Sequence, residues 1–245
     1  MILTVRHGER GDKSPNEYEK QKVKLYYDPH LTEFGSLQAQ ITGMEIKSKL
    51  LAFNDELKSK GMSSWKKITP VIITSPFLRT IQTAYHIARN LDEIYQNTIF
   101  IQNEIAELLW DQQEFDLDPL PILLSRTQKL EDFRDYGVDF LTSGLNLKSK
   151  LFSDPEFIQP KYPEQKDECI KRVQTFLKKV PKLFFEKFKF NKYVLICVTH
   201  QFTLAAAMWF YEDLTPLEFP DSMIPLCGIV NCRFDDQKII WRSTE

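Results

Sequence analysis

Three apolar runs of the sequence end in basic residues, and this pattern limits the folds that the chain can adopt. Residues 2–5, 71–74 and 193–198 are rich in Val, Ile and Leu, as buried strands are. Strands that alternate with helices predict right-handed crossovers and a mainly parallel sheet. The carboxyl ends of parallel strands share one edge, where ligands bind. We therefore expect the three basic ends to meet around one ligand.

The first of these ends is Arg6-His7-Gly8-Glu9-Arg10. An imidazole between two guanidiniums suits a phosphate group, because a neutral imidazole nitrogen can attack phosphorus while arginines hold the equatorial oxygens. Gly8 lets the backbone turn sharply beside the ligand. An isolated histidine is most often structural, but His7 with an arginine on each side predicts an anion site.

The other two ends repeat the idea. Pro76, after the run at residues 71–74, suits the first turn of a helix, which would place Arg79 and free amides near its positive end. The third run stops at Thr199 and His200. His86 continues the helix without cationic neighbours and is predicted to be structural, whereas His30 lies in a loop and is a candidate for substrate contact.

These motifs resemble those of the histidine phosphatase superfamily, which includes the phosphoglycerate mutases. The resemblance rests on Arg6-His7-Gly8, on the block from Ser75 to Ala84 and on Val198-Thr199-His200, and it extends to the segment from Asp28 to Gly35. It spans almost the whole chain apart from the middle. Arg10 after Glu9 resembles the phosphatase domain of the suppressor proteins of T-cell receptor signalling more than it resembles the mutases.

The resemblance implies a phosphatase that works through a phosphohistidine on His7. Glu107 would donate a proton to the leaving group and then activate the water that hydrolyses the phosphoenzyme, and Glu104 is the competing candidate. The phosphate pocket would be formed by four further side chains, namely Arg6, Arg10, Arg79 and His200. His200 is also expected to be catalytic. Such a pocket acts by positioning and electrostatics, so neither a metal nor a cofactor is expected.

Departures from the family pattern favour a hydrolase. Gly11 and Asp12 follow Arg10, and Gln201 follows His200, which disfavours the acid phosphatase and phytase branch; the Ser and Trp-Asn of the mutases are also missing. Two alternatives remain open, a phosphoglycerate mutase-type phosphotransferase and a non-catalytic phosphate-binding scaffold protein. The sequence does not decide between a phosphorylated small molecule and a phosphoprotein as the substrate.

Cys227 and Arg233 have the spacing of cysteine-dependent phosphatases. Those enzymes wrap the five intervening residues as a loop between a strand and a helix. Residues 228–234 instead have the pattern of a strand, followed by a turn and a second strand over residues 238–242. We therefore expect a terminal hairpin in place of a cysteine nucleophile.

One domain over residues 1–245 is expected from the length and from 42% hydrophobic residues. Its predicted fold is a three-layer α/β/α structure, with helices on both faces of a mainly parallel sheet and an antiparallel edge strand. Four apolar residues recur near helical spacing and predict a helix, namely Leu37, Ile41, Met44 and Leu51. This helix is expected to break at Gly61. A further helix begins near Pro163, and Pro181 should end or kink it.

Residues 111–163 contain five prolines and little periodicity, and they are interpreted as an inserted helical lid. Insertions at this edge of a sheet commonly shape a substrate pocket. The candidate specificity residues are Arg126, Arg134, Lys148 and Lys150.

The composition gives no bias toward nucleic acid or membrane, since 32 basic and 34 acidic residues leave a net charge of −2. Four cysteines without a Cys-x-x-Cys pair favour neither disulfides nor zinc. The first apolar run begins at Met1 and no run reaches membrane length, so we expect a cytoplasmic protein without a signal peptide. The oligomeric state is left open, a homodimer included.

Overall fold

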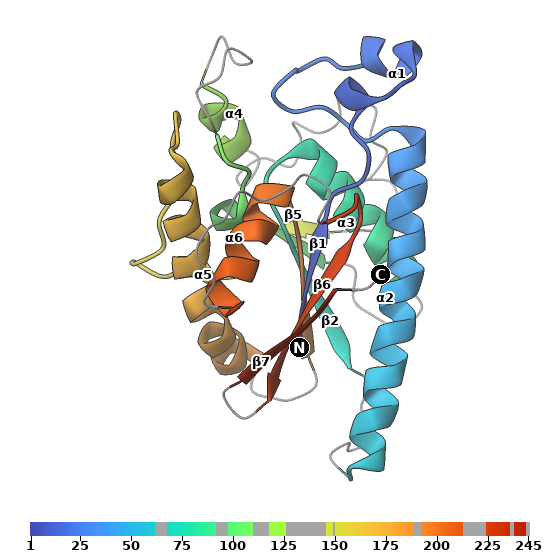
Figure 1. The fold of residues 1–245 in the computed structure, drawn as a ribbon, viewed down its shortest axis with the longest axis vertical. Helices are drawn as coiled ribbons and strands as arrows, with labels where there is room; N and C mark the ends of the chain where they lie inside the picture. The colour runs from blue at the N-terminus through green and yellow to red at the C-terminus, as the bar shows by residue number, and fades with distance from the viewer. Residues whose placement is uncertain are drawn as a thin grey trace.

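A seven-stranded sheet forms the centre of the part of the chain that the structure describes (Figure 1). The computed structural model describes residues 1–61, 68–91, 98–109, 118–125, 146–148, 150–188, 193–212, 224–235 and 238–243. In spatial order the strands are β4 (Asn146–Lys148), β3 (Thr98–Ile101), β2 (Thr69–Thr74), β5 (Tyr193–Thr199), β1 (Ile2–Arg6), β6 (Ile229–Asp235) and β7 (Lys238–Ser243).

The strands from β4 to β1 run parallel to one another, whereas β6 pairs antiparallel with β1 and β7 with β6. The mainly parallel sheet, its antiparallel edge and the terminal hairpin are therefore confirmed. Arg6 lies opposite Thr199, and Thr74 lies opposite Val198. Because of this register, the residues that follow β1, β2 and β5 leave the sheet side by side.

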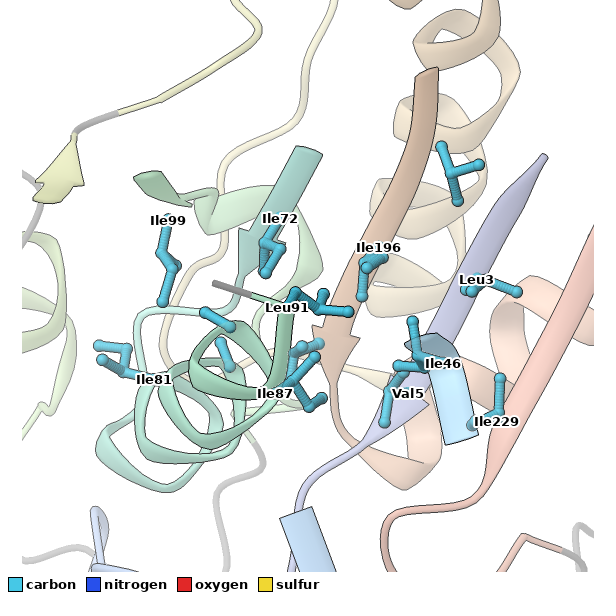
Figure 2. Close-up of a cluster of buried hydrophobic side chains, with 14 of the residues drawn as sticks. Leu3, Val5, Ile46, Ile72, Ile81, Ile87, Leu91, Ile99, Ile196 and Ile229 are labelled. Atoms are coloured by element: carbon cyan, nitrogen blue, oxygen red, sulfur yellow. The ribbon is translucent and has the colours of Figure 1, made fainter. Parts of the chain in front are cut away.

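Helices cover both faces of the sheet because its central strands are apolar on both sides. On one face the strands pack against α2 (Glu33–Ser59) and α3 (Leu78–Leu91), through residues that include Leu3, Val5, Ile72 and Ile196 (Figure 2). The alternate residues contact α5 (Lys166–Phe188) and α6 (Gln201–Glu212), and they include Ile2, Val71, Ile73 and Leu195. The three-layer α/β/α fold is confirmed.

Helix α2 is present as predicted, and the chain turns beyond it at Gly61, whose φ is 66°. The apolar residues that predicted the helix nevertheless face solvent: they are 48% to 60% exposed, these being Leu37, Ile41, Met44 and Leu51. Its buried side carries small residues such as Gly43, where a Cβ would lie only 3.0 Å from the Cα of Ile87 on α3. Close packing between the two helices therefore decides which side of α2 is buried, and the apolar spacing did not reveal that side.

Helix α5 begins at Lys166 and continues through Pro181 to Phe188. Pro181 was expected to end or kink this helix; it does not end it, and a kink there stays a prediction. Val180 and Phe184, on either side of the proline, are both buried in the same core cluster. Their burial stabilises the helical path across one missing backbone hydrogen bond.

Part of the expected lid lies among the described residues, and Arg126 and Arg134 lie outside them. Within this segment, α4 (Leu120–Ser125) is a short helix, while β4 pairs with β3 as part of the main sheet. Three aromatic or aliphatic residues after β4 are buried in the same cluster as α5, namely Leu151, Phe152 and Phe157. This stretch builds the sheet edge and the core, and the lid itself stays a prediction.

Short elements complete the described chain, namely η1 (Gly11–Lys13), α1 (Glu17–Gln21) and η2 (Asn103–Ile105). None of the described helices has both the length and the apolar composition that crossing a membrane requires. The thiols of Cys169, Cys197 and Cys227 are buried, and none of them forms a disulfide with another described residue.

Candidate active site

His7 follows β1 directly and is held by its backbone on both sides. Its N–H donates to the carbonyl of Thr199 at 3.0 Å, and its carbonyl accepts from the N–H of Cys227 at 3.2 Å. Nδ1 of the ring lies 2.7 Å from the carbonyl oxygen of Gly8. Because a carbonyl only accepts, Nδ1 carries the proton and Nε2 keeps a free lone pair. Burial, and after it the charge of Arg79, holds the pKa of His7 well below its usual 6.5, so the imidazole is neutral at pH 7.

The loop after His7 lies against the first turn of α2. The N–H of Gly8 donates to Oγ1 of Thr83 at 3.1 Å, and the N–H of Glu9 donates to the side chain of Gln38 at 2.9 Å. A Cβ at Gly8 would lie 2.5 Å from the carbonyl oxygen of Gly35, and a Cβ at Gly35 would overlap the backbone of Glu9. Gly8 is therefore required by close backbone approach, which adds to the sharp turn expected from the sequence.

Arg79 lies in the first turn of α3 with its side chain only 3% exposed. The carboxylate of Asp28 accepts from the N–H of Leu78 at 2.7 Å and lies 3.9 Å from Nη1 of Arg79. Among the described residues, Nε and Nη1 of this guanidinium have no hydrogen-bond partner. Burial, and after it the charge of Arg10, lowers the pKa of Arg79 to about 10, so the side chain stays charged at neutral pH. A buried cation with unused donors is suited to a bound anion.

Arg6 and Arg10 bring two further guanidiniums to the same place. Nη1 of Arg6 donates to the carbonyl of Ile224 at 2.6 Å. Arg10 is held by Asp12, with Nε 2.9 Å from Oδ1 and Nη2 2.5 Å from Oδ2. Both positive charges contribute to the lowered pKa of His7, which means that both lie near its ring.

His200 follows β5 and is fully buried beside His7, with 5.4 Å between the ring centroids. Its Nε2 lies 2.7 Å from Oγ of Ser75. Its Nδ1 lies 3.2 Å from Oε2 of Glu107 but lacks hydrogen-bond geometry with any described residue. Burial, and after it the charge of Arg79, lowers the pKa of His200 well below 6.5.

The two candidate acids lie in different surroundings. Oε2 of Glu107 lies 3.7 Å from Nη2 of Arg79, and this side chain is 23% exposed. Burial raises the pKa of Glu107 above its usual 4.5, against the opposing charges of Arg79 and Arg10. Glu104 is 1% exposed and its carboxylate accepts from Gln102 at 2.5 Å and from Gln159 at 2.7 Å. The geometry therefore brings Glu107, and not Glu104, to the histidines.

His7, His200 and Glu107 also form a set of potential metal ligands, with their ligand atoms within 4.8 Å of one another. The guanidiniums of Arg6, Arg10 and Arg79 lie close enough to His7 for their charges to lower its pKa. Their positive charges oppose a cation and favour an anion.

The other predicted residues lie elsewhere. His30 contacts Glu19 at 3.4 Å and lines a separate pocket, which none of the six predicted site residues lines. Lys148 is exposed on β4, and Lys150 lies 3.6 Å from Glu104. His86 was expected to lack cationic neighbours, but Arg89 lies near it: burial, and then the charge of Arg89, lowers the pKa of His86 to about 4.

Ser75 and Asp28 lie in segments that resemble the superfamily, but neither was predicted to have a role in the site. Ser75 contacts His200, and Asp28 accepts from the start of α3 beside Arg79. Ser75 directly follows a strand and Asp28 precedes a helix, and these positions in the sequence could have indicated that both lie near the site. Cys227 is buried, which raises the pKa of its thiol to about 12, and residues 229–235 form β6 as expected.

Comparison with solved structures gives the same fold. The ecdysone phosphate phosphatase of Bombix mori, in complex with tungstate, matches with a TM-score of 0.58 and 19% identity, covering 100% of this chain and 91% of that one. A phosphoserine phosphatase mutant of Entamoeba histolytica, in complex with phosphoserine, matches with a TM-score of 0.52 and 16% identity, covering 98% and 93%. A mycobacterial glucosyl-3-phosphoglycerate phosphatase matches with a TM-score of 0.52 and 14% identity, covering 99% and 96%.

The chain therefore has the fold of these phosphatases, and the fold expected from the resemblance to the histidine phosphatase superfamily is confirmed. The branch of the suppressor proteins of T-cell receptor signalling is not singled out and stays a prediction. No family model matches the sequence, and no curated protein sequence matches it.

Proposed function

We propose that the protein is a phosphatase that hydrolyses a phosphomonoester through a phosphohistidine on His7. The observation that carries this proposal is a neutral, buried imidazole with a free Nε2 beside the guanidiniums of Arg6, Arg10 and Arg79. A phosphoryl group needs a nucleophile on one side and cations around its equatorial oxygens. The unused donors of Arg79 support the same proposal, because a buried charge calls for a partner.

In the first step, Nε2 of His7 attacks phosphorus and the bond from phosphorus to the leaving oxygen breaks. Glu107 gives its proton to that oxygen, so that the alcohol leaves neutral. The raised pKa of Glu107 supports this role, because an acid must hold its proton before it can donate it.

In the second step, water attacks the phosphohistidine and the bond from phosphorus to nitrogen breaks. Glu107, now ionised, takes a proton from the water. His7 leaves as a neutral imidazole, Glu107 is protonated again, and phosphate departs. The guanidiniums, with Nδ1 of His200, offset negative charge on the three equatorial oxygens in both steps.

The substrate we propose is a phosphorylated small molecule. Two of the structures that share the fold contain phosphoserine and 3-phosphoglyceric acid, and a third is an ecdysone phosphate phosphatase. A phosphoprotein would present the same group to the same cations. Buried cysteines that form no disulfide among the described residues, namely Cys169, Cys197 and Cys227, support a reducing compartment such as the cytoplasm.

The test is release of p-nitrophenol from p-nitrophenyl phosphate by the wild type, by His7→Ala and by the control His86→Ala. We expect turnover in the wild type and in His86→Ala, and none in His7→Ala. Acid-labile label should be trapped on His7 after rapid quenching with labelled substrate. Turnover that persists in His7→Ala would contradict the mechanism. Binding of vanadate without any turnover would indicate a scaffold protein, and transfer of phosphate to a second metabolite would indicate a phosphotransferase.

A further inference from the structure

We infer that Arg172 and Glu164 are positioning residues that hold Glu107 in place for proton transfer. This inference rests on the proposed function, because it assigns Arg172 and Glu164 to the proton-transfer part of that reaction. Neither residue touches the phosphate pocket. They act through the backbone of residues 104–109, which we call the acid segment.

Arg172 lies on α5 and is completely buried. Its guanidinium is paired with the carboxylate of Glu164, with Nε 2.7 Å from Oε1 and Nη2 2.6 Å from Oε2. This is a two-point contact of a planar guanidinium with a carboxylate, which fixes the orientation of both groups. The charge of the arginine is thereby neutralised, and its remaining donors point elsewhere.

Those remaining donors contact carbonyl groups of the acid segment. Nη1 of Arg172 donates to the carbonyls of Glu104 at 2.9 Å and Ala106 at 3.2 Å, and Nη2 donates to the carbonyl of Glu107 itself at 3.3 Å. The partner residue contributes as well, since the backbone N–H of Glu164 donates to the carbonyl of Leu109 at 2.7 Å. One buried ion pair therefore holds both ends of the acid segment.

Two hydroxyl groups hold the same segment from the side of the histidines. Oγ1 of Thr199 donates to the carbonyl of Ile105 at 2.7 Å, and Oγ1 of Thr203 donates to the carbonyl of Ala106 at 2.9 Å. Thr199 ends β5 and Thr203 lies in the first turn of α6, so both are fixed to the elements that carry His200. The acid segment is thus connected to the imidazoles by a continuous set of hydrogen bonds.

These contacts matter because residues 106–109 have no regular secondary structure of their own. A backbone without helical or sheet partners takes its position from whatever satisfies its carbonyls. The carboxylate of Glu107 must stay 3.2 Å from Nδ1 of His200 to face a group bound at His7. Proton transfer requires such geometry to be kept, and small displacements reduce rates strongly.

Two substrates with different leaving groups distinguish a loss of positioning at Glu107 from a general loss of stability. Phenyl phosphate needs an acid for its leaving oxygen, whereas 2,4-dinitrophenyl phosphate leaves readily without one. For Arg172→Lys we expect kcat/KM to fall about 10- to 100-fold on phenyl phosphate and less than about twofold on 2,4-dinitrophenyl phosphate. Glu164→Gln should show the same pattern. On phenyl phosphate, the fall of kcat/KM at high pH that reports ionisation of Glu107 should become smaller as kcat/KM itself is lost.

Two further variants keep the test decisive if a change at Arg172 impairs folding. Thr203→Val removes a single hydrogen bond to the acid segment and should reproduce the same selective loss at smaller size. Lys179→Met is the matched control, because Lys179 lies on the same helix and pairs with Asp154 at 2.7 Å, away from the acid segment. It should leave both substrates unaffected.

Equal losses on the two substrates in Arg172→Lys and Thr203→Val, or no loss in either, would overturn this inference while leaving a His7-dependent phosphatase intact. A wild type without His7-dependent turnover would overturn the proposed function, and the inference with it. A loss confined to phenyl phosphate supports both.

Discussion

Two arginines among the residues that the structure describes, Arg79 and Arg172, are buried, and their surroundings are opposite. Arg172 is 0% exposed and has a carboxylate at 2.6 Å and three carbonyls as partners. Arg79 is 2% exposed, has carboxylates only at 3.7 and 3.9 Å, and has two nitrogens without a hydrogen-bond partner among the described residues. The pKa of Arg79 is lowered to about 10, chiefly by burial, whereas the pKa of Arg172 is raised because the negative groups around it outweigh its burial.

Under the proposed function, this difference separates the charge of Arg172, which serves the fold, from the charge of Arg79, which would bind a ligand. A fully paired buried ion is costly to remove, because its partner is left behind. An underpaired one destabilises the protein until an anion arrives, and that destabilisation becomes binding free energy. Four experiments test this contrast between Arg172 and Arg79.

The largest effect is expected for the stability of Arg172→Met. Glu164 would remain buried without a partner and three carbonyls would lose a donor, so the free energy of unfolding should fall by about 3–5 kcal/mol. Urea denaturation measures it. Replacing both residues at once, Glu164→Leu with Arg172→Met, should restore part of the loss. An Arg172→Met protein as stable as the wild type would remove the basis of the comparison.

The next effect concerns the activity of Arg79→Met. Loss of this guanidinium should lower kcat/KM about 10²- to 10³-fold, because charge on the transferred phosphoryl group is no longer offset. The free energy of unfolding should not fall, since an underpaired charge has been removed from the interior. Arg89→Met, in the last turn of the same helix, is the control for both measurements. Clear destabilisation by Arg79→Met would mean that this arginine also serves the fold.

Ligand binding provides a third measurement, in which the variants should again differ. Vanadate at about 100 times its Kd should raise the free energy of unfolding of the wild type by about 2.7 kcal/mol. Arg172→Lys should keep this increase, because its change lies away from the pocket. Arg79→Met should show little of it. Equal stabilisation of all three proteins would show that the anion binds somewhere else.

The smallest effect is a displacement of the pH profile. Protonated His7 cannot attack phosphorus, so kcat/KM on 2,4-dinitrophenyl phosphate should fall about tenfold per pH unit below the pKa of His7. Burial and Arg79 hold that pKa well below 6.5, so activity should be constant from pH 6.5 to neutrality. Removing the positive charge in Arg79→Met favours imidazolium and moves the acid limb to higher pH. Arg172→Lys should leave the acid limb at the same pH as in the wild type. A shift of that limb in Arg172→Lys would contradict the distinction between Arg79 and Arg172.

The sequence alone was sufficient for the part of the site that depends on strand ends. Residues directly after β1, β2 and β5 meet because parallel strands bring their carboxyl ends to one edge. The register pairs Arg6 with Thr199, the residues that directly precede His7 and His200. The same rule, with Pro76 before α3, predicted the location of Arg79. Roles within the site remain proposals, although the geometry brings the six predicted residues together.

What the sequence did not reveal depends on tertiary contacts between distant segments. Arg172 and the carbonyl of Glu104 are 68 residues apart. Every residue has a backbone carbonyl, so the sequence does not indicate which one accepts a hydrogen bond from Arg172. The exposed apolar residues of α2 and the passage of α5 through Pro181 have a similar origin. In each case the packing of one element against another decided the outcome, and local spacing carries no information about it.

The contact between the loop after His7 and the start of α2 has a consequence for variation at this site. Gly8 and Gly35 each lie against the backbone of the other segment. A methyl group on either residue would meet main-chain atoms, so a smaller side chain on the opposite segment could not make room for it. Both positions are already at the lower limit of residue size. Any substitution at this crossing therefore requires the main chains of the loop after His7 and of α2 to separate, which would displace the imidazole of His7 as well.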